Sequence, residues 1–317
     1  MVGLANDVPN LLSNARAPST NLVYGRAFQK WKEWAACYSE VRDIPAEPTH
    51  VVLYLTHLAK SAKSFATVNV AICALAWAHA LAGLESPSKN VLVLEVLQGI
   101  KRGLAKPTVH REPFAPEHVK AFFDVLNKKS LTDLRNTVII VIAYYGFFRF
   151  EEVSSITLDQ VSFHSTHVEI FIPKSKADQL RQGNTVVIAK LGGVYCPVEL
   201  LEQYINTICP EHAICSSNQY LFRRVFTTKG VARLADENNS VSYNVVRQII
   251  KQKATQIGLN NKAFGTHSMR AGGASAAANS SVGDRILQKH GRWASVSSRD
   301  RYVKDSLENR LQVTKNM

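Results

Sequence analysis

The sequence predicts a mainly α-helical protein with one small β-sheet, arranged in two domains. A chain of 317 residues is longer than a single hydrophobic core usually serves. Apolar residues recur at helical spacing throughout positions 19–105. Two short runs rich in β-branched residues, 168–172 and 185–188, interrupt later helical patterns. We therefore expect the sheet to lie in the second domain.

Four short helices account for positions 19–105. Ser19 or Thr20 can cap the first helix, which carries Tyr24, Phe28, Trp31 and Trp34 on one face. The second follows Pro45 and Pro48, the third runs from Ala66 to Leu81, and the fourth follows Ser86-Pro87 and ends at Lys101-Arg102. Apolar faces on four short helices predict a compact bundle over residues 1–106.

A polar stretch with two prolines and no periodicity, residues 107–114, predicts an extended linker. Pro116 is favourable in the first turn of a helix, so the second domain is expected to cover residues 115–317. Within it we expect helices to about residue 155 and again from about residue 197, with a loop-rich interval near 214–241.

The charge of the chain indicates a polyanionic partner. Its 38 Lys and Arg exceed its 25 Asp and Glu, which gives a formal net charge of +13. Nucleic acid is favoured because neutralisation of phosphates by Lys and Arg drives such binding. Charge alone also suits an anionic membrane surface or a ribosomal contact. The longest apolar run, Val138 to Phe148, is too short to cross a bilayer and predicts a buried helix.

The five cysteines are scattered along the chain. They form neither a CxxC pair nor a metal-like spacing with histidines, so we expect no zinc site. An odd number of cysteines without a signal peptide predicts reduced thiols and an intracellular protein. The sequence shows no sorting segment that would distinguish a nuclear protein of a eukaryote from a cytoplasmic or nucleoid protein of a prokaryote.

Several side chains suited to phosphate chemistry occur in the second domain. His267 and Arg270 lie one helical turn apart, and Thr266 can cap their helix, whose N-terminus adds partial positive charge near a phosphate. A His-x-x-Arg pair alone is common by chance. Arg149 interrupts an apolar stretch, and a buried arginine needs a partner, which Glu152 one turn later can supply.

Four further positions have both a structural and a chemical interpretation. Lys174 and Lys176 lie in the turn between the two β runs, where lysines are usually solvated but can also act as a general acid. Trp293 can be a packing residue or an indole donor to a phosphate, and His290 can compete with it. Tyr302, nine positions after Trp293, can be a surface residue or a nucleophile.

Taken in order, these residues resemble the tyrosine recombinase (phage-integrase-like) family. The segment 146–153 is similar to the family's first arginine box, and the interval from Trp293 to Tyr302 to its last box. Residues 175–178 resemble its β-hairpin lysine, which favours Lys176 over Lys174. The resemblance covers nearly the whole chain. It implies a helical core-binding (SAM-like) domain at the N-terminus and a mixed α+β tyrosine-recombinase catalytic domain after it.

The resemblance also implies an activity. The expected enzyme is a site-specific recombinase or integrase, with a mobile element as its expected source, that cleaves and rejoins double-stranded DNA through a 3′-phosphotyrosyl intermediate. It needs no metal, ATP or other cofactor and acts as a homotetramer on two duplexes, away from membranes. The implied catalytic residues are Arg149, Lys176, His267, Arg270, Trp293 and the nucleophile Tyr302, with Glu152 in a supporting role.

Two other functions remain open from the sequence. One is a nicking and resealing enzyme similar to type IB topoisomerases, and the other is a catalytically silent DNA-binding protein. The sequence departs from the family after the second arginine, where Ala271 and Gly272-Gly273 stand in place of the commoner bulky or basic residues. Neither the target DNA sequence nor the choice between integration, excision and resolution can be read from the chain.

Overall fold

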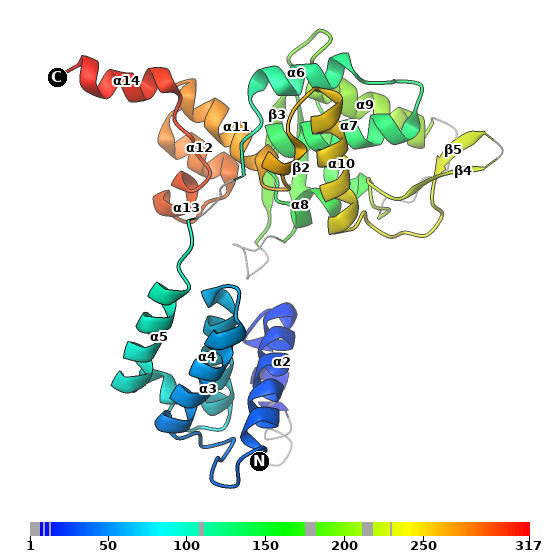
Figure 1. Cartoon of the computed structure of the whole chain (residues 1–317). Helices are drawn as coiled ribbons and strands as arrows, with labels where there is room; N and C mark the ends of the chain where they lie inside the picture. The colour runs from blue at the N-terminus through cyan, green and yellow to red at the C-terminus, as the bar shows by residue number, and fades with distance from the viewer. Residues whose placement is uncertain are drawn as a thin grey trace. The chain divides into compact units, whose positions relative to one another are not determined.

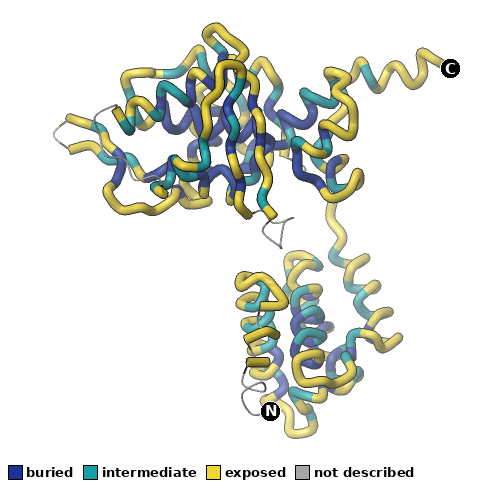
Figure 2. Tube along the Cα trace, turned by 180° about the vertical axis from the view of Figure 1, so that it is seen from behind, coloured by how far each residue is buried: buried dark blue, intermediate teal, exposed yellow. Residues whose placement is uncertain are grey.

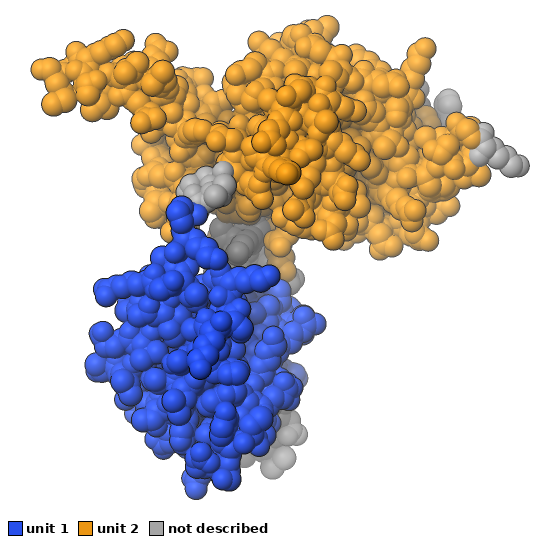
Figure 3. Space-filling view, in the orientation of Figure 1, with its two compact units in different colours: residues 1–109 blue, residues 110–317 orange. Residues whose placement is uncertain are grey.

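The structure, a computed structural model, describes residues 7–8, 10–12, 14–107, 111–174, 182–210, 218–228 and 230–317. The chain is mostly helical and contains a small antiparallel sheet, so the expected fold class is confirmed (Figure 1). The chain forms two compact units, residues 1–109 and 110–317 (Figure 3), and each encloses a buried interior (Figure 2).

The first unit consists of helices α2 (Pro18–Ala35), α3 (Pro48–Ser61), α4 (Phe65–Leu81) and α5 (Val91–Gly103), with a 3₁₀ turn, η1 (Pro87–Lys89). Helix α2 contacts α4, and α3 contacts both α4 and α5. The fully buried Trp31 anchors this core, and its Nε1 donates to the carbonyl of Asp43 at 2.8 Å. Burying one face of each helix is what stabilises so small a bundle.

The first helix begins differently from the expectation. Ala17 occupies the N-cap position and Pro18 the first turn, without a side-chain cap, so the predicted capping by Ser19 or Thr20 is wrong. Proline is pre-organised for the first helical position because its φ is fixed and its missing N–H needs no partner there.

The second unit contains more elements. Its helices are α6 (Pro116–Asp124), α7 (Leu131–Tyr145), α8 (Phe150–Ser154), α9 (Pro197–Ile208), α10 (Tyr243–Gln256), α11 (Ser268–Asn279), α12 (Asp284–Gly291), α13 (Val296–Asp300) and α14 (Leu307–Lys315). Its 3₁₀ turns are η2 (Leu158–Gln160) and η3 (Asn261–Ala263), and its strands are β1 (Val161–Phe163), β2 (His167–Ile172), β3 (Asn184–Ala189), β4 (Val225–Thr228) and β5 (Val231–Leu234).

Helix α7 forms the centre of this unit. Its residues from Leu134 to Tyr144 are all buried, and it contacts α9, α10 and α11. The predicted buried helix over the longest apolar run is therefore confirmed. In the described part of the chain, no helix combines the length and the apolar character needed to span a membrane.

The three-stranded sheet is antiparallel in the order β1-β2-β3. Along β2, Val168, Ile170 and Ile172 are buried, while the alternate residues face outward (Figure 2). The pairing of Ile172 with Asn184 places the connection between β2 and β3 at one end of the sheet. The connection between β1 and β2 consequently lies at the other end.

A second, two-stranded sheet pairs β4 with β5 inside the interval that was expected to be loop-rich. Each strand has four residues, and only Leu234 among them is buried. An exposed hairpin this short carries almost no alternation of apolar and polar residues, which is the pattern that identifies a strand. Strand β1 was missed for the same reason.

Two glycines set the distance between α11 and its neighbours. A Cβ atom at Gly272 would lie 2.2 Å from the carbonyl oxygen of Phe114, and one at Gly273 would lie 2.1 Å from that of Tyr144. These glycines, which the sequence marks as departures from the family pattern, therefore allow the close helix packing that holds Arg270 beside the end of α7.

Residues 111–114, expected to belong to a linker, run along the second unit. The backbone N–H of Glu112 donates to Ala263 at 2.9 Å, and that of Phe114 donates to Ser268 at 3.1 Å.

The cysteines only partly follow the expectation of reduced thiols. Cys37, Cys73 and Cys196 are free. Cys209 is disulfide-bonded, so the expectation is wrong at this position.

Candidate active site

The first arginine lies at a turn between two helices. Helix α7 ends at Tyr145, and Phe147 then adopts a left-handed backbone with φ of 47°. Arg149 occupies the N-cap position of α8 and is half-buried. A left-handed conformation is uncommon for a bulky residue and persists only where the surroundings enforce it. Arg270 and Arg292 both donate hydrogen bonds to the carbonyl of Phe147, and these bonds hold the turn in place.

Glu152 is the acidic centre of the site. Its carboxylate accepts the Nη1 of Arg149 at 2.7 Å and the backbone N–H of Arg149 at 2.9 Å. It also accepts the Nη2 of Arg292 at 2.9 Å and lies 3.8 Å from the Nη1 of Arg270. Burial by itself would raise the pKa of Glu152, but the three arginines and the N–H of Arg149 hold it below its usual value. The carboxylate is therefore ionised and orients Arg149.

Arg270 is completely buried, although it carries a charge. Its Nη1 donates to the carbonyl of Phe147 and its Nη2 to the carbonyl of Gly291. Burial, followed by the nearby charge of Arg149, lowers the pKa of Arg270 to about 9, in spite of the opposing effect of Glu152. The guanidinium is thus incompletely compensated by this chain, and an anionic ligand would stabilise it.

A third arginine, Arg292, was not among the site residues expected from the sequence. Its backbone is left-handed, with φ of 55°, and directly follows α12. Its guanidinium donates to the carbonyls of Gly146, Phe147 and His290 at 3.1, 2.9 and 2.8 Å. Together with its bond to Glu152, these contacts tie the end of α12 to the turn that carries Arg149. In the sequence, Arg292 is recognisable only as an arginine between Gly291 and Trp293. An arginine on the surface would look the same, so the sequence alone does not predict its role.

Two aromatic rings lie against the guanidinium of Arg270, and a third ring lies next to one of them. Its guanidinium carbon lies 4.7 Å from the centre of the Trp293 ring and 4.9 Å from that of Tyr302. The His267 and Tyr302 rings are 6.0 Å apart between centres. His267 is itself the N-cap residue of α11, so the predicted cap at Thr266 is wrong. The structure therefore brings His267, Arg270, Trp293 and Tyr302 into one cluster, with Arg149 joined to it through Glu152.

Three buried donors in the cluster have no partner among the residues that the structure describes. They are the indole Nε1 of Trp293 and the Nε atoms of Arg270 and Arg292. Buried polar groups are normally hydrogen-bonded, so these donors are suited to an acceptor such as a phosphate oxygen.

The backbone around Tyr302 is fixed to α11 by Ser275. The hydroxyl of Ser275 donates to the carbonyl of Tyr302 at 3.3 Å and accepts the backbone N–H of Lys304 at 2.9 Å. Tyr302 itself is half-buried. The phenol is therefore held by its main chain and remains accessible.

Two other expected positions that the structure describes, Lys174 and His290, do not join the cluster. Lys174 is exposed after the end of β2, and Lys176 lies outside the described residues. The Nε2 of His290 lies 2.8 Å from the carbonyl of Tyr145, so this ring bonds to the end of α7. Burial lowers the pKa of His290 below its usual value, which favours the neutral imidazole.

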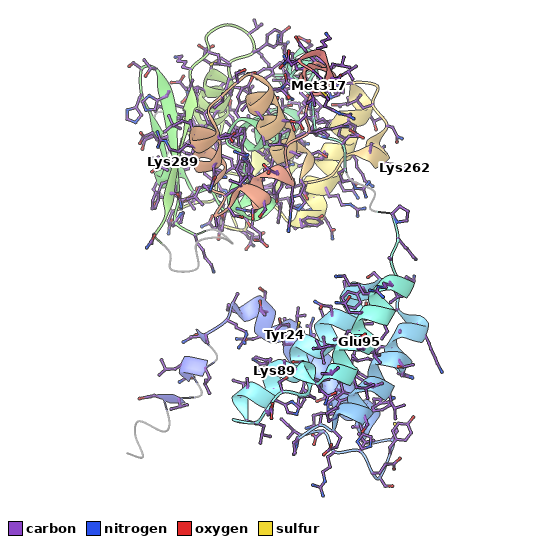
Figure 4. The ribbon with its side chains drawn as sticks, turned by 90° about the vertical axis from the view of Figure 1, so that its left-hand side faces the viewer. Tyr24, Lys89, Glu95, Lys262, Lys289 and Met317 are labelled. Atoms are coloured by element: carbon purple, nitrogen blue, oxygen red, sulfur yellow. The ribbon has the colours of Figure 1, made fainter. Side chains whose placement is uncertain are left out.

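A hollow of about 640 Å³ opens beside Trp293. Its rim includes Arg285, Lys289 and Arg299, against one carboxylate, Asp284. Lys289 is labelled in Figure 4, which draws side chains of the whole chain as sticks. A basic hollow next to the cluster can accommodate a phosphate backbone.

The charges of the cluster are unbalanced. Arg149, Arg270 and Arg292 all pair with the single carboxylate of Glu152 in the part of the chain that the structure describes. Guanidinium groups present a planar fork of donors that matches phosphate oxygens. The cluster is therefore suited to bind a phosphodiester beside a tyrosine hydroxyl.

Residues 113–309 match the phage integrase family. This range contains every residue of the cluster. The chain belongs to the phage integrase family. By family, the chain is therefore a tyrosine recombinase.

Known family members resemble the chain over most of its length. It is 26% identical over 310 residues to an integrase/recombinase XerD homolog from Selenomonas ruminantium, covering 95% of this chain and 87% of the relative. The structure of the XerH site-specific recombinase bound to palindromic difH substrate, in its post-cleavage complex, aligns with a TM-score of 0.60 at 14% identity, covering 88% of this chain and 74% of XerH. A lambda integrase tetramer bound to a Holliday junction aligns with a TM-score of 0.58 at 13% identity, covering 95% of this chain and 76% of that chain.

Proposed function

We propose that this chain is a site-specific DNA recombinase that cleaves and rejoins DNA through a covalent bond between Tyr302 and a 3′ phosphate. The observation that carries the proposal is the excess of buried guanidinium charge over carboxylate charge beside the Tyr302 ring. Membership of the phage integrase family and the fold shared with DNA-bound recombinases support it.

In the proposed reaction, the Tyr302 oxygen attacks a backbone phosphorus, and the bond from phosphorus to the 5′ oxygen breaks. The tyrosine loses its proton, and the leaving 5′ oxygen gains one. Because the phosphodiester is exchanged for a phosphotyrosyl ester, the bond energy is conserved and the reaction consumes neither ATP nor a metal-activated water. Attack by a 5′ hydroxyl from another duplex completes recombination, whereas attack by the original hydroxyl restores the starting DNA.

Each side chain has a distinct part in this proposal. Arg149 and Arg270 hold the non-bridging oxygens, where negative charge grows in the transition state. Trp293 donates its indole N–H to the same phosphate, and His267 bonds the phosphate or accepts the proton of Tyr302. Glu152 acts through Arg149 as a positioning residue.

Two assignments rest on the family resemblance. Lys176 protonates the leaving 5′ oxygen, and the first unit acts as a core-binding domain that completes a clamp around double-stranded DNA. We also propose that the chain assembles as a homotetramer on two duplexes, as lambda integrase does on a Holliday junction. The protein is accordingly DNA-associated, and an origin in a mobile element fits the same family.

The test is covalent trapping on DNA. Because the target sequence is not known, the full chain is incubated with a library of randomised duplexes that carry a nick, so that cleavage near the nick releases a short strand and prevents rejoining. Covalent adducts resist denaturation by detergent, and sequencing their DNA gives the target site. We expect the wild type to form adducts and Tyr302→Phe to form none.

A matched control is Tyr195→Phe, which removes a hydroxyl that donates to Asp124 at 2.9 Å, outside the cluster. This variant is expected to form adducts at the wild-type level. Adducts that persist in Tyr302→Phe would overturn the assignment of the nucleophile, and their absence from the wild type would leave a DNA-binding protein without cleavage. Joint molecules formed from two duplexes distinguish a recombinase from a topoisomerase-like enzyme, which only relaxes supercoils.

A further inference from the structure

A group of metal-binding side chains lies at the turn between β1 and β2, outside the proposed active site. His164 precedes the turn, and His167 and Glu169 belong to β2. One ligand atom from each residue lies within 4.8 Å of those of the other two. The turn is at the end of β2 opposite the connection to β3.

The register of the hairpin itself creates this group. Phe163 pairs with Val168, and the backbone N–H of His164 donates to the carbonyl of His167 at 2.8 Å. The two histidines therefore stand opposite each other across the strands. Because side chains alternate between the faces of a strand, His167 and Glu169 lie on the same face of β2. Three ligands thus converge on the outer face of the sheet by backbone geometry alone.

The three side chains lie close enough together to reach one shared ion. The two imidazole rings are stacked, with centres 4.4 Å apart and an angle of 13° between their planes. The Oε1 of Glu169 lies 3.5 Å from the Nε2 of His167, and its Oε2 lies 3.9 Å from the Nε2 of His164. Ligand atoms around a tetrahedral zinc ion are about 3.3 Å apart, given bonds of about 2.0–2.1 Å. The three ligand atoms lie within 4.8 Å of one another, so rotation of the side chains must shorten their separations to reach that spacing.

An outer contact also orients one of the ligands. The Nδ1 of His167 lies 3.0 Å from the hydroxyl of Thr166. When Nδ1 carries the proton and donates it to Thr166, the lone pair of Nε2 is available to a metal. Histidine ligands in proteins commonly have such a partner at their second nitrogen.

The neighbouring strand offers the carboxylate no competing cation. His167 and Glu169 stand opposite Ala189 and Val187 of β3. The nearby Lys190 has its ammonium group 3.9 Å from Glu199.

We propose that His164, His167 and Glu169 form a binding site for one divalent transition metal ion, with zinc as the preferred class. Two imidazoles and one carboxylate suit zinc, whereas magnesium and calcium prefer oxygen ligands throughout. Three protein ligands leave at least one position to water. The cysteine spacing led us to expect no zinc site. The site proposed here uses histidine and carboxylate ligands instead. It does not depend on the recombinase function.

Binding is measured by titrating the full chain with zinc chloride in a calorimeter, after removal of any purification tag and without chelators. Cobalt, monitored by its visible absorption, serves as a second probe. We expect one saturable site in the wild type and none in the His164→Ala/His167→Ala double variant. Zinc should also raise the melting temperature of the wild type in a concentration-dependent manner, because binding to the folded state stabilises it.

Two single variants sharpen the test. Thr166→Ala is expected to weaken the affinity for zinc by about 10-fold or more, as is usual for a lost outer partner. His57→Ala, which removes an exposed histidine from α3, should bind like the wild type. All variants change exposed or half-exposed residues, and circular dichroism verifies their folding. Zinc binding that persists in the double variant, or no saturable binding by the wild type, would overturn the proposal.

Discussion

At the residue scale, Glu152 compensates three arginines in a buried environment, and this predicts how stability depends on pH. The folded pKa of Glu152 is lowered from its usual 4.5. A lowered folded pKa means that the ionised carboxylate stabilises the fold fully above pH 4.5 and that this contribution is lost as the pH falls through the folded value. Glu152→Gln removes this titration. We expect the wild type to lose more unfolding free energy than Glu152→Gln between about pH 6 and about pH 3, measured by urea denaturation.

The control is Glu151→Gln, which neutralises an exposed neighbour in the same helix. Its pH dependence should follow that of the wild type. If Glu152→Gln and the wild type lose stability in parallel, Glu152 does not carry the ionic compensation of the site.

The residues of the site differ in how far the sequence could predict them. Arg149, His267, Arg270, Trp293 and Tyr302 could be proposed because their order along the chain resembles a family pattern. Arg292 could not, because its role depends on a left-handed backbone and on carbonyls 145 and 146 positions earlier in the chain. The His164 group was missed for a related reason, since it exists only in the register of a hairpin whose first strand was itself not predicted.

At the scale of elements, the packing of α11 against α7 determines where Arg270 lies. Gly272→Ala would place a methyl group 2.2 Å from the carbonyl oxygen of Phe114, so the helix must move. We expect a loss of about 1–3 kcal/mol in unfolding free energy, as for other overpacked interiors. Covalent adduct formation should fall as well, because a displaced Arg270 no longer meets the phosphate. Urea denaturation and the trapping assay measure the two effects.

Gly99→Ala is the matched control, because Gly99 lies within α5 and a Cβ there meets nothing within 4 Å. Alanine is favoured over glycine inside a helix by about 0.5–1 kcal/mol, so this variant should be as stable as the wild type or more stable. A Gly272→Ala protein with wild-type stability and activity would show that α11 can shift without cost.

The elements also differ in how far the sequence predicts them. Helices such as α7 and α5 are long enough for their apolar spacing to be unmistakable. The short strands β1, β4 and β5 have three or four residues each and few buried side chains, so their pairing depends on distant partners. The two glycines of α11 weaken a helix locally, and only the approach of Phe114 and Tyr144 explains them.

At the scale of the whole molecule, a net charge of +13 predicts DNA binding that weakens with salt. Each phosphate that a Lys or Arg neutralises releases counterions, so the logarithm of the affinity falls linearly with the logarithm of salt concentration. Lys289 lies on the rim of the basic hollow beside Trp293. Lys289→Ala is expected to reduce the steepness of this dependence by about 1 and to weaken binding to all sequences similarly.

Fluorescence anisotropy on the full chain measures these slopes, in a Tyr302→Phe background so that no covalent adduct forms. Lys315→Ala, at the end of α14 and not among the residues that line the hollow, controls for the loss of any one cation. Equal changes in slope for Lys289→Ala and Lys315→Ala would mean that DNA is held by general charge. A change confined to Lys289→Ala places the phosphate backbone in the hollow, beside the residues proposed to cleave it.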